Sequence, residues 1–351
     1  SGGWGVVAGA ALPGSMSGEV IRMRYVVYGA GAIGAGIGGR LHQHGFDVTL
    51  IARGEHLRVM QHDGLRLRAP GEDLRIPVRA VGHPAEIDWR GDEAVILTTK
   101  TQDTLAALED LRATAGSGVP VFCAQNGAEN ERMALRRFPN TYAMLIHMPS
   151  NFTTPGEVVV QSSPVTALLD AGRYPSGTDA TAEAVCADLS RAACVAQADP
   201  QVMRLKWAKL LYVNLGNAVQ AVCGPDAPAG DLARLLRQEA LAAFAAAGID
   251  CATAEEWNAR AGLITPKPVE GFTRGGGSTW QSLVRGTGSV ETDYLNGEIA
   301  YLAGLGGIAA PTHRALQDLS AKVVRERLEP GTVTVAEVMA LARQFGAAVP
   351  G

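Results

Sequence analysis

A glycine-rich hexapeptide near the start of the chain has the residue types and spacing that bind the pyrophosphate of a dinucleotide. Directly after the apolar run 25–28 the chain reads Gly29, Ala30, Gly31, Ala32, Ile33 and Gly34, which is the pattern GxGxxG. The first glycine of such a turn permits the tight bend, the second lets backbone approach the pyrophosphate, and the third lets the helix pack closely on the strand. The following helix would direct free N–H groups at the phosphates.

The residues after this turn decide how much weight it carries, because GxGxxG alone is a weak signal in a chain with 42 glycines. A helix-compatible segment, 35–44, and a second apolar strand, 47–52, complete one βαβ unit. That strand ends in Arg53 and not in the Asp or Glu that would accept hydrogen bonds from the ribose of NAD. An arginine can pair with the 2′-phosphate of NADP, so the sequence predicts NADP(H) as the cofactor. The alternative is a surface arginine that follows a strand.

Two further strands end in polar residues that would meet the same edge of the sheet. The strand 94–99 is followed by Lys100, and the strand 119–124 leads into Asn126 and Gly127. Ligands of open α/β sheets gather at the carboxyl ends of strands, so Lys100 could contact phosphate or substrate and Asn126 could lie beside it. A solvated lysine and an ordinary Asn-Gly turn are the simpler explanations.

The segment 201–223 combines an apolar helix with polar residues that need partners. Its apolar residues lie almost all round the expected helix, which indicates burial. Lys209, Asn214 and Asn217 lie inside it, and burying such groups unpaired costs several kcal/mol. Lys209 and Asn217 would fall within about 80° of each other and two turns apart, so a polar stripe could face a ligand. Alternatively, the lysine reaches the surface and the asparagines cap loops.

A second polar group follows in the last third of the chain. Residues 275–281 read as a flexible loop rich in hydroxyls, with Ser278 and Thr279 in it and 275–277 as a hinge. Glu291 opens the next expected helix, where the helix dipole alone would favour a carboxylate. A functional role for Glu291 is the alternative.

The elements that must position these residues change type along the chain. Further strands at 142–147, 156–161 and 165–170 would complete a mixed sheet of six or more strands, with an exposed hairpin formed by 65–67 and 74–78. Helical patterns occupy 54–62 and 179–193 and then dominate, at 231–247, 253–261, 291–305, 312–327 and 335–344. We therefore predict an α/β protein with a Rossmann-type sheet domain, 23–200, followed by a mainly α-helical substrate and catalytic domain, 201–351. Residues 1–22 read as a leader that is disordered.

The composition excludes several other classes of protein. The chain has 351 residues, 19% charged and 47% apolar, with a net charge of −4, so we expect neither a nucleic-acid nor a membrane partner. No run approaches the ~18 apolar residues of a membrane span. The five cysteines form no CxxC pair, which fits free thiols in a reducing cytoplasm and no metal site.

Six motifs in this order resemble the ketopantoate reductases, that is, the 2-dehydropantoate 2-reductases, over residues 23–327. They are the GxGxxG turn 29–34, Gln-Asn-Gly at 125–127, Pro-Gly-Glu-Val at 155–158, Lys-Trp-Ala-Lys-Leu at 206–210, Ser-Thr at 278–279 and Glu-Thr-Asp-Tyr-Leu-Asn-Gly at 291–297. The resemblance implies reduction of 2-dehydropantoate to pantoate with NADPH, a step of pantothenate biosynthesis.

The resemblance also implies roles for individual residues. Lys209 matches the lysine that protonates the substrate carbonyl as hydride arrives, and a ketone reduced by hydride does need an acid at its oxygen. Asn126 matches an asparagine that touches nicotinamide and substrate, and Glu291 a glutamate that contacts the cofactor ribose and the active site. The substrate itself is held by helix asparagines, here Asn217 with Asn214 nearby, and its carboxylate end by a serine pair, here Ser278 and Thr279.

The chain departs from the family pattern at positions that bear on the substrate. The family has an asparagine four residues after the lysine, where this chain has Val213, and Asn214 comes one place later. Lys206 and Asn214 repeat the eight-residue spacing of Lys209 and Asn217, so the phase of the helix stays open. Trp280 replaces a smaller residue beside the serine pair.

These departures leave the fold and reaction type untouched but open the identity of the acid. The leading hypothesis is an NADPH-dependent 2-oxo acid reductase that acts on 2-dehydropantoate in the cytoplasm, as a monomer or a homodimer. The alternatives are a related dehydrogenase for another 2-oxo or hydroxy acid, or a non-catalytic NADP-binding sensor.

Overall fold

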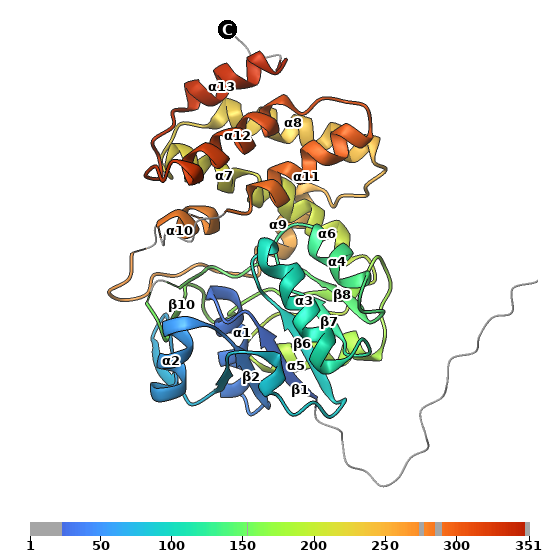
Figure 1. Cartoon of the computed structure of the whole chain (residues 1–351), viewed down its shortest axis with the longest axis vertical. Coiled ribbons are helices and arrows are strands. Elements are labelled where there is room, and N and C mark those ends of the chain that lie inside the picture. Colours follow the sequence, from blue (N-terminus) through green and yellow to red (C-terminus); the bar gives the residue numbers. More distant parts are fainter. Residues whose placement is uncertain (1–22, 153, 274–276, 285–289, 348–351) are drawn as a thin grey trace, which may run out of the picture.

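The computed structural model describes residues 23–152, 154–273, 277–284 and 290–347, and the expected leader, 1–22, lies outside them. Figure 1 shows a half built on β-sheets and, above it, a half built from helices. The predicted fold class, a Rossmann-type sheet domain followed by a mainly α-helical C-terminal domain, is confirmed.

A seven-stranded sheet with the order β11-β8-β7-β6-β1-β2-β5 organises the first half. All its neighbouring strands pair in parallel except β11, which runs antiparallel to β8. The strands are β1 Arg24–Tyr28, β2 Val48–Ile51, β5 Arg79–Val81, β6 Glu93–Leu97, β7 Val121–Cys123, β8 Thr141–Met144 and β11 Ala171–Arg173. Short apolar runs suit these strands because helices cover both faces of the sheet.

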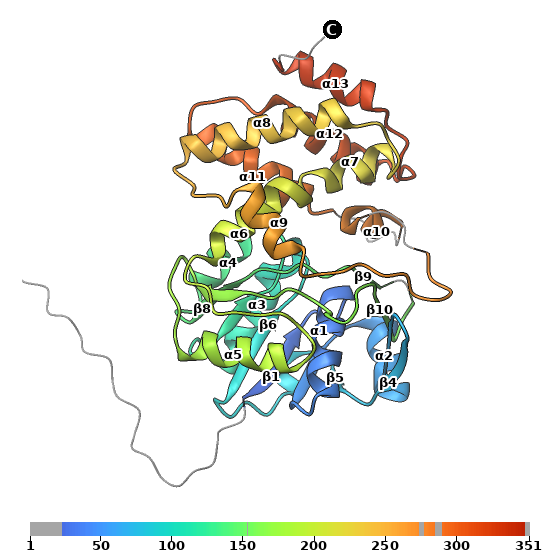
Figure 2. The same cartoon turned by 180° about the vertical axis from the view of Figure 1, so that it is seen from behind.

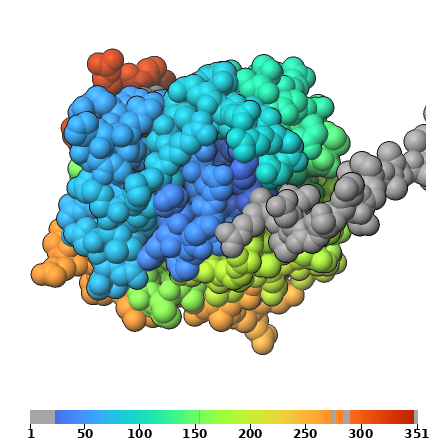
Figure 3. Space-filling model, turned by 90° about the horizontal axis from the view of Figure 1, so that it is seen from below, coloured from blue at the N-terminus to red at the C-terminus, as the bar shows by residue number. Residues whose placement is uncertain are grey.

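Alternation along the interior strand β1 places one core on each face of the sheet. Val27 of β1 packs in the cluster that contains residues of α1 and α5, whereas Val26 packs in the cluster that contains residues of α3. The helices of this half are α1 Ala32–Gln43, α2 Gly54–Asp63, α3 Thr101–Ala115, α4 Glu129–Leu135 and α5 Ala180–Arg191, with a 3₁₀ turn at Pro84–Glu86. Seen from the end opposite the helical half, elements of the sheet half form most of the surface (Figure 3).

A separate four-stranded sheet, β4-β3-β10-β9, corrects two predictions. Its strands are β3 Leu65–Ala69, β4 Glu72–Ile76, β9 Ser150–Asn151 and β10 Glu157–Val160. The predicted hairpin forms, but one of its faces is buried against α1. The helix approaches so closely that a Cβ added to Gly39 of α1 would lie 3.1 Å from the side chains of both Leu65 and Leu67. The strand predicted at 156–161 pairs in parallel with β3 and so belongs to this sheet and not to the main one.

The strand predicted at 165–170 does not form. Within this segment only Leu168 makes isolated bridges, to His147 and Val195, and the strand β11 begins at Ala171. Leu168 and Leu169 are fully buried. The segment is therefore apolar because it is buried, a pattern that a strand would also produce.

The second half contains the helices α6 Val202–Lys209, α7 Gly216–Cys223, α8 Gly230–Ala246, α9 Ala254–Ala261, α10 Ser278–Val284, α11 Thr292–Leu305, α12 Pro311–Arg325 and α13 Val335–Gln344. Helix α10 corrects the prediction of a loop at 275–281, whose first glycines lie outside the described residues. Figures 1 and 2 both place α10 between α7 and the sheet half. The segment after α9 returns to the sheet half, where the Lys267 N–H donates to the Gln161 carbonyl at 2.9 Å.

The single long helix predicted at 201–223 is interrupted by one turn of π-helix, Leu210–Asn214, which we call the π-turn. The N–H of Leu215 bonds the carbonyl of Leu210 at 3.1 Å, five residues back and not four. This extra residue turns Val213 outward, where it is 37% exposed, and buries Asn214 to 3%. Within the described part of the chain, no helix has the length and apolar content needed to cross a membrane.

Candidate active site

The glycine-rich turn has the shape of a phosphate cradle. Gly29 has φ +106°, and a Cβ on Gly34 would lie 2.4 Å from the Gly29 carbonyl oxygen, so neither position accepts a side chain. A Cβ on Gly31 would meet no protein atom within 4 Å, which leaves open space at the second glycine. The first turn of α1 has free N–H groups beside that space, because the first intrahelical bond runs from Ala35 to Gly31.

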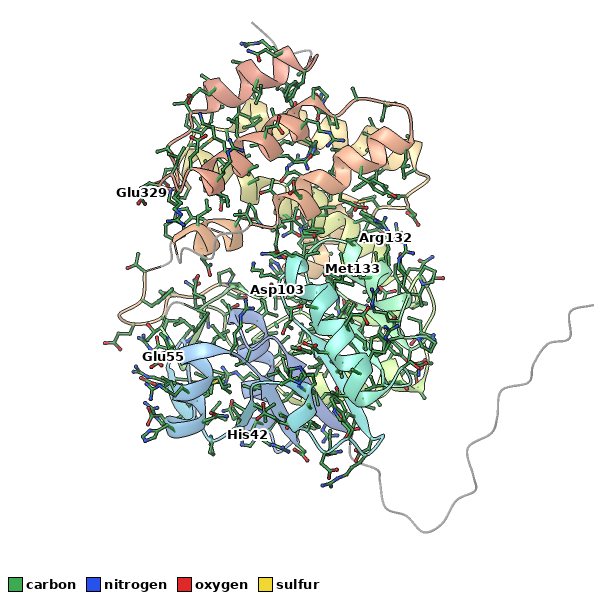
Figure 4. All side chains as sticks on the ribbon, in the orientation of Figure 1. His42, Glu55, Asp103, Arg132, Met133 and Glu329 are labelled. Carbon is green, nitrogen blue, oxygen red and sulfur yellow. The ribbon has the colours of Figure 1, made fainter. Side chains whose placement is uncertain are left out.

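Arg53 lies at the carboxyl end of β2, as the sequence predicts, and it is exposed. Its side chain has a relative exposure of 86%, and its guanidinium lies 3.3 Å from a carboxylate oxygen of Asp103. Asp103 belongs to the first turn of α3, and Figure 4 places it at the end of α3 nearest the helical half, whereas His42 lies at the far end of the sheet half. The edge that carries Arg53 and Asp103 therefore faces the helices.

An ion pair joins this edge to the helical half. The Lys100 ammonium, which follows β6, lies 2.6 Å from a carboxylate oxygen of Glu291 at the start of α11. The other carboxylate oxygen of Glu291 accepts from the Thr101 hydroxyl at 3.0 Å and the Thr101 N–H at 3.2 Å. Burial alone would raise the pKa of Glu291, but Lys100 and Thr101 outweigh it, so the pKa lies below its usual value and the carboxylate is ionised.

Lys209 and Asn126 meet across the same boundary. The Lys209 ammonium donates to the side-chain carbonyl of Asn126 at 2.8 Å and to the backbone carbonyl of Ile146. Burial, together with the nearby charge of Lys206, lowers the pKa of Lys209 to about 7, although Glu291 acts in the opposite direction. A buried lysine with such a pKa gives up its proton readily near neutral pH, which suits a general acid.

The structure assigns different partners to the two lysines of α6. Lys206 is buried and forms an ion pair with Glu131 of α4. Its ammonium also donates to the carbonyls of Gln125 and Cys123, at 3.0 and 3.2 Å. Lys209, and not Lys206, therefore faces Asn126.

Two polar residues farther along this helix, Asn217 and Gln220, lie close to Gly277, which directly precedes α10. Asn214 Oδ1 and Thr279 Oγ1 are buried and accept or donate no hydrogen bond within the described residues. Asn217 Oδ1 would lie 3.0 Å from a Cβ on Gly277, whose N–H donates to Gln220 Oε1 at 3.0 Å. Ser278 begins α10, but its side chain lies outside what the structure describes. The predicted substrate-binding roles of these residues stay predictions.

Several residues that support the site were missed by sequence reasoning. His56 of α2 lies 2.7 Å from the Ala30 carbonyl through Nε2 and accepts from the Gly156 N–H at 2.7 Å through Nδ1, so it holds the glycine-rich turn. Thr98 donates to the Gly29 carbonyl at 2.8 Å. His56 could have been suspected from its position three residues after Arg53 on a polar helix. Its hydrogen bonds themselves could not, because they join residues that are far apart in sequence.

Comparison with known proteins identifies the family of the chain. Models of the "Ketopantoate reductase PanE/ApbA" family and of its C-terminal part match residues 25–171 and 201–324. The "2-dehydropantoate 2-reductase" of Halobacterium salinarum is 28% identical over 85% of this chain and 97% of its own length. That of Pyrococcus horikoshii is 28% identical over 57% of this chain, and the match spans only 64% of that relative. The 2-dehydropantoate 2-reductase of Mesorhizobium japonicum is 35% identical over 30% of this chain, and the match spans 32% of that relative.

Solved structures show the same fold. A PanE/ApbA family ketopantoate reductase from Ralstonia eutropha superposes with a TM-score of 0.71 at 24% identity over 87% of this chain and 99% of that one. A D-mandelate dehydrogenase, solved with NADH and anilino(oxo)acetate, superposes with a TM-score of 0.75 at 22% identity over the same shares. Because the two family models together match most of its length, this chain belongs to the ketopantoate reductase PanE/ApbA family.

Proposed function

We propose that the protein reduces a 2-oxo acid to the 2-hydroxy acid with NADPH, with 2-dehydropantoate as the leading substrate and Lys209 as the general acid. The observation that carries this proposal is the buried contact between Lys209 and Asn126 at 2.8 Å, on the sheet edge that holds the glycine-rich turn. The names of the relatives support the choice of substrate.

The residues present fit NADPH. The open space at Gly31 and the N-terminus of α1 would receive the pyrophosphate, and Arg53 would pair with the 2′-phosphate. Lys100, Glu291 and Asn126 would hold the part of the cofactor nearer the substrate. When bound, NADPH supplies the hydride.

The chain's own residues would then supply the proton and orient the acid. The Lys209 ammonium donates its proton to the carbonyl oxygen, which becomes the hydroxyl of the product while Lys209 becomes a neutral amine. Asn126 orients the ammonium through the bond at 2.8 Å. Asn214 and Thr279, buried with side-chain oxygens that find no partner among the described residues, would bind the polar end of the substrate.

A second candidate is a dehydrogenase for a 2-oxo acid with a bulkier side chain. Trp280 lies half-buried beside Thr279 in α10, where it would narrow or reshape the substrate end of the site. The D-mandelate dehydrogenase neighbour was solved with an aromatic oxo acid, which makes such acids worth testing.

We place the reaction in the cytoplasm, in line with the free thiols of the five cysteines.

The test is NADPH oxidation by the purified protein with 2-dehydropantoate, phenylglyoxylate and a small panel of other 2-oxo acids. We expect Lys209→Met to lower kcat about 10²–10⁴-fold with NADPH affinity retained, because it removes the acid and not the cofactor site. The exposed Lys322→Met is the matched control and should keep normal turnover. Normal turnover by Lys209→Met would refute the general-acid role, and NADPH binding without turnover of any acid by the wild type would favour the sensor.

A further inference from the structure

A buried ion pair lies next to the proposed catalytic lysine, one turn earlier in α6. The side chain of Lys206 is 3% exposed and that of Glu131 is fully buried, and their charged groups are in contact. Lys206 precedes Lys209 by three residues, so both lysines project from one side of α6. Both ammonium groups reach the polypeptide that follows β8: Lys206 donates to the Met144 carbonyl at 3.3 Å and Lys209 to the Ile146 carbonyl.

Fold stability alone does not account for such a pair. Removing two charges from water costs several kcal/mol per ion, and apolar residues of similar size often replace buried ion pairs with no loss of stability. The pair does make specific contacts: the Lys206 ammonium donates to the carbonyl of Gln125, the residue directly before Asn126. Glu131 lies in α4, which begins just after the same loop.

We propose that Lys206 and Glu131 form a positioning pair, which holds the Asn126 loop in place and sets the charge around Lys209. The inference rests on the proposed function, since it gives Lys206 and Glu131 a role in that same reaction. Neither residue would touch the substrate. The carboxylate fixes Lys206, Lys206 fixes the carbonyl before Asn126, and Asn126 orients Lys209.

The charged groups around Lys209 come from two elements. Lys206 faces it from its own helix and Glu291 from the start of α11, while Glu131 and the thiol of Cys123 face Lys206 from α4 and β7. Burial is the largest cause of the lowered pKa of Lys209, the Lys206 charge is the second, and Glu291 opposes both. The pair therefore gives Lys209 a neighbouring positive charge that Glu131 keeps partly balanced.

The test follows the titration of Lys209 by NMR in protein carrying ¹³C-labelled lysine. The spectrum is simple, because the lysines of the chain are Lys100, Lys206, Lys209, Lys267 and Lys322. In Lys206→Met/Glu131→Gln, which removes both charges, we expect the midpoint of Lys209 to rise by about one pH unit. In Glu131→Gln alone, Lys209 faces the Lys206 charge without the carboxylate that balances it, so the midpoint of Lys209 should move to lower pH than in the wild type.

The activity should follow the titration. The basic limb of the kcat/KM profile with NADPH and the best 2-oxo acid should move up in the double variant and down in Glu131→Gln. A purely structural pair would change stability without moving the limb in opposite directions. Because the titration needs no turnover, an inactive wild type with shifted titrations would count against the proposed function alone.

The matched control is the neighbouring ion pair of Arg132 with Glu298. Their charged groups are 2.7 Å apart, and Arg132 follows Glu131 in α4, but neither residue is among the charges that shift Lys209. Arg132→Met/Glu298→Gln should leave the titration of Lys209 unchanged. A folded Lys206→Met/Glu131→Gln protein with an unshifted Lys209 would overturn the proposal; if that variant does not fold, an unshifted Glu131→Gln would do so.

Discussion

Burial and a like charge act on Lys209 in the same direction, and both lower its pKa, to about 7 from the usual 10.5. A lysine with a lowered pKa binds a proton more weakly in the folded than in the unfolded chain. Between these two pH values the unfolded chain holds more protons, so the free energy of unfolding rises with pH in this window. Below about pH 7 the folded protein bears the full cost of a buried cation.

Lys209→Met should therefore stabilise the protein while it lowers kcat. We expect a gain of about 2 kcal/mol near pH 6 that shrinks as the pH rises toward about 10. Urea unfolding of both proteins at the two ends of this window measures the difference. The exposed Lys322→Met should show no such pH dependence, and an equal gain for Lys209→Met at both ends would mean that the lysine is not desolvated.

The pair of Arg53 with Asp103 bears on the preference for NADPH over NADH. The guanidinium that would bind the 2′-phosphate already lies 3.3 Å from a carboxylate, and both side chains are exposed. Asp103→Asn should tighten NADPH binding about threefold, and Arg53→Gln should weaken it about tenfold, while NADH affinity stays nearly constant in both. Nicotinamide fluorescence titrations measure both constants. Equal changes for NADPH and NADH would show that neither residue reads the phosphate.

Among the elements, the π-turn contains Asn214, so the proposed substrate side of the site depends on it. Asn296 of α11 is fully buried, and its side-chain amide donates to the Leu215 carbonyl, just after the π-turn, at 3.3 Å. The same amide lies 3.3 Å from Nδ1 of His313, whose pKa burial lowers to about 4, so His313 is neutral and can accept this bond. One buried asparagine thus supports the turn that buries Asn214.

Asn296→Ala should loosen the π-turn and raise KM for the 2-oxo acid about tenfold, with NADPH affinity unchanged. The control is Gln317→Ala, which removes the 2.8 Å bond to Asp293 between the same two helices at the surface. Steady-state kinetics and NADPH titration of both variants provide the measurement. If Asn296→Ala weakened NADPH binding and left KM unchanged, the π-turn would belong to the cofactor side.

The sequence predicted most elements but not this interruption, for a physical reason. A helix with one π-turn contains one residue more, in that turn, than a regular α-helix. The apolar residues of 201–223 lie all round the helix and therefore fit both. Asn214, one place later than the family pattern, was the only sign. The π-turn accounts for it, since five residues in one turn bring Asn214 near the direction that four would reach in an α-helix.

Pairing between distant residues was the other part that the sequence did not predict. Arg53, Lys100, Asn126 and Lys209 follow from local patterns, because strand ends and a polar residue in an apolar helix are visible along the chain. The partner of Lys206 lies 75 residues away in α4 by sequence number (206 − 131), and no periodicity relates them. For the same reason the buried face of the hairpin β3–β4 depended on packing against α1.

Across the molecule, two ion pairs between described residues connect the sheet half to α11. Lys100 pairs with Glu291 beside the proposed cofactor site, and Arg132 pairs with Glu298 two turns farther along the helix, as Figure 4 shows for Arg132 at the boundary of the halves. Only the first pair adjoins the glycine-rich edge. Arg132 and Glu298 therefore connect the two halves away from that edge, whereas Lys100 and Glu291 connect them beside the proposed cofactor site.

Glu291→Gln should raise the Kd for NADPH about tenfold and speed amide exchange in the first turn of α3, because Lys100 and Thr101 lose their carboxylate. Its pKa is lowered in the folded chain, so the stability it contributes is present above its usual 4.5 and is lost as the pH falls through the folded value. The unfolding free energies of variant and wild type should therefore converge in acid.

Glu298→Gln breaks the other ion pair and should leave the NADPH affinity unchanged. Equal losses of affinity in both variants would mean that the contact between the halves, and not Glu291 itself, sets cofactor binding.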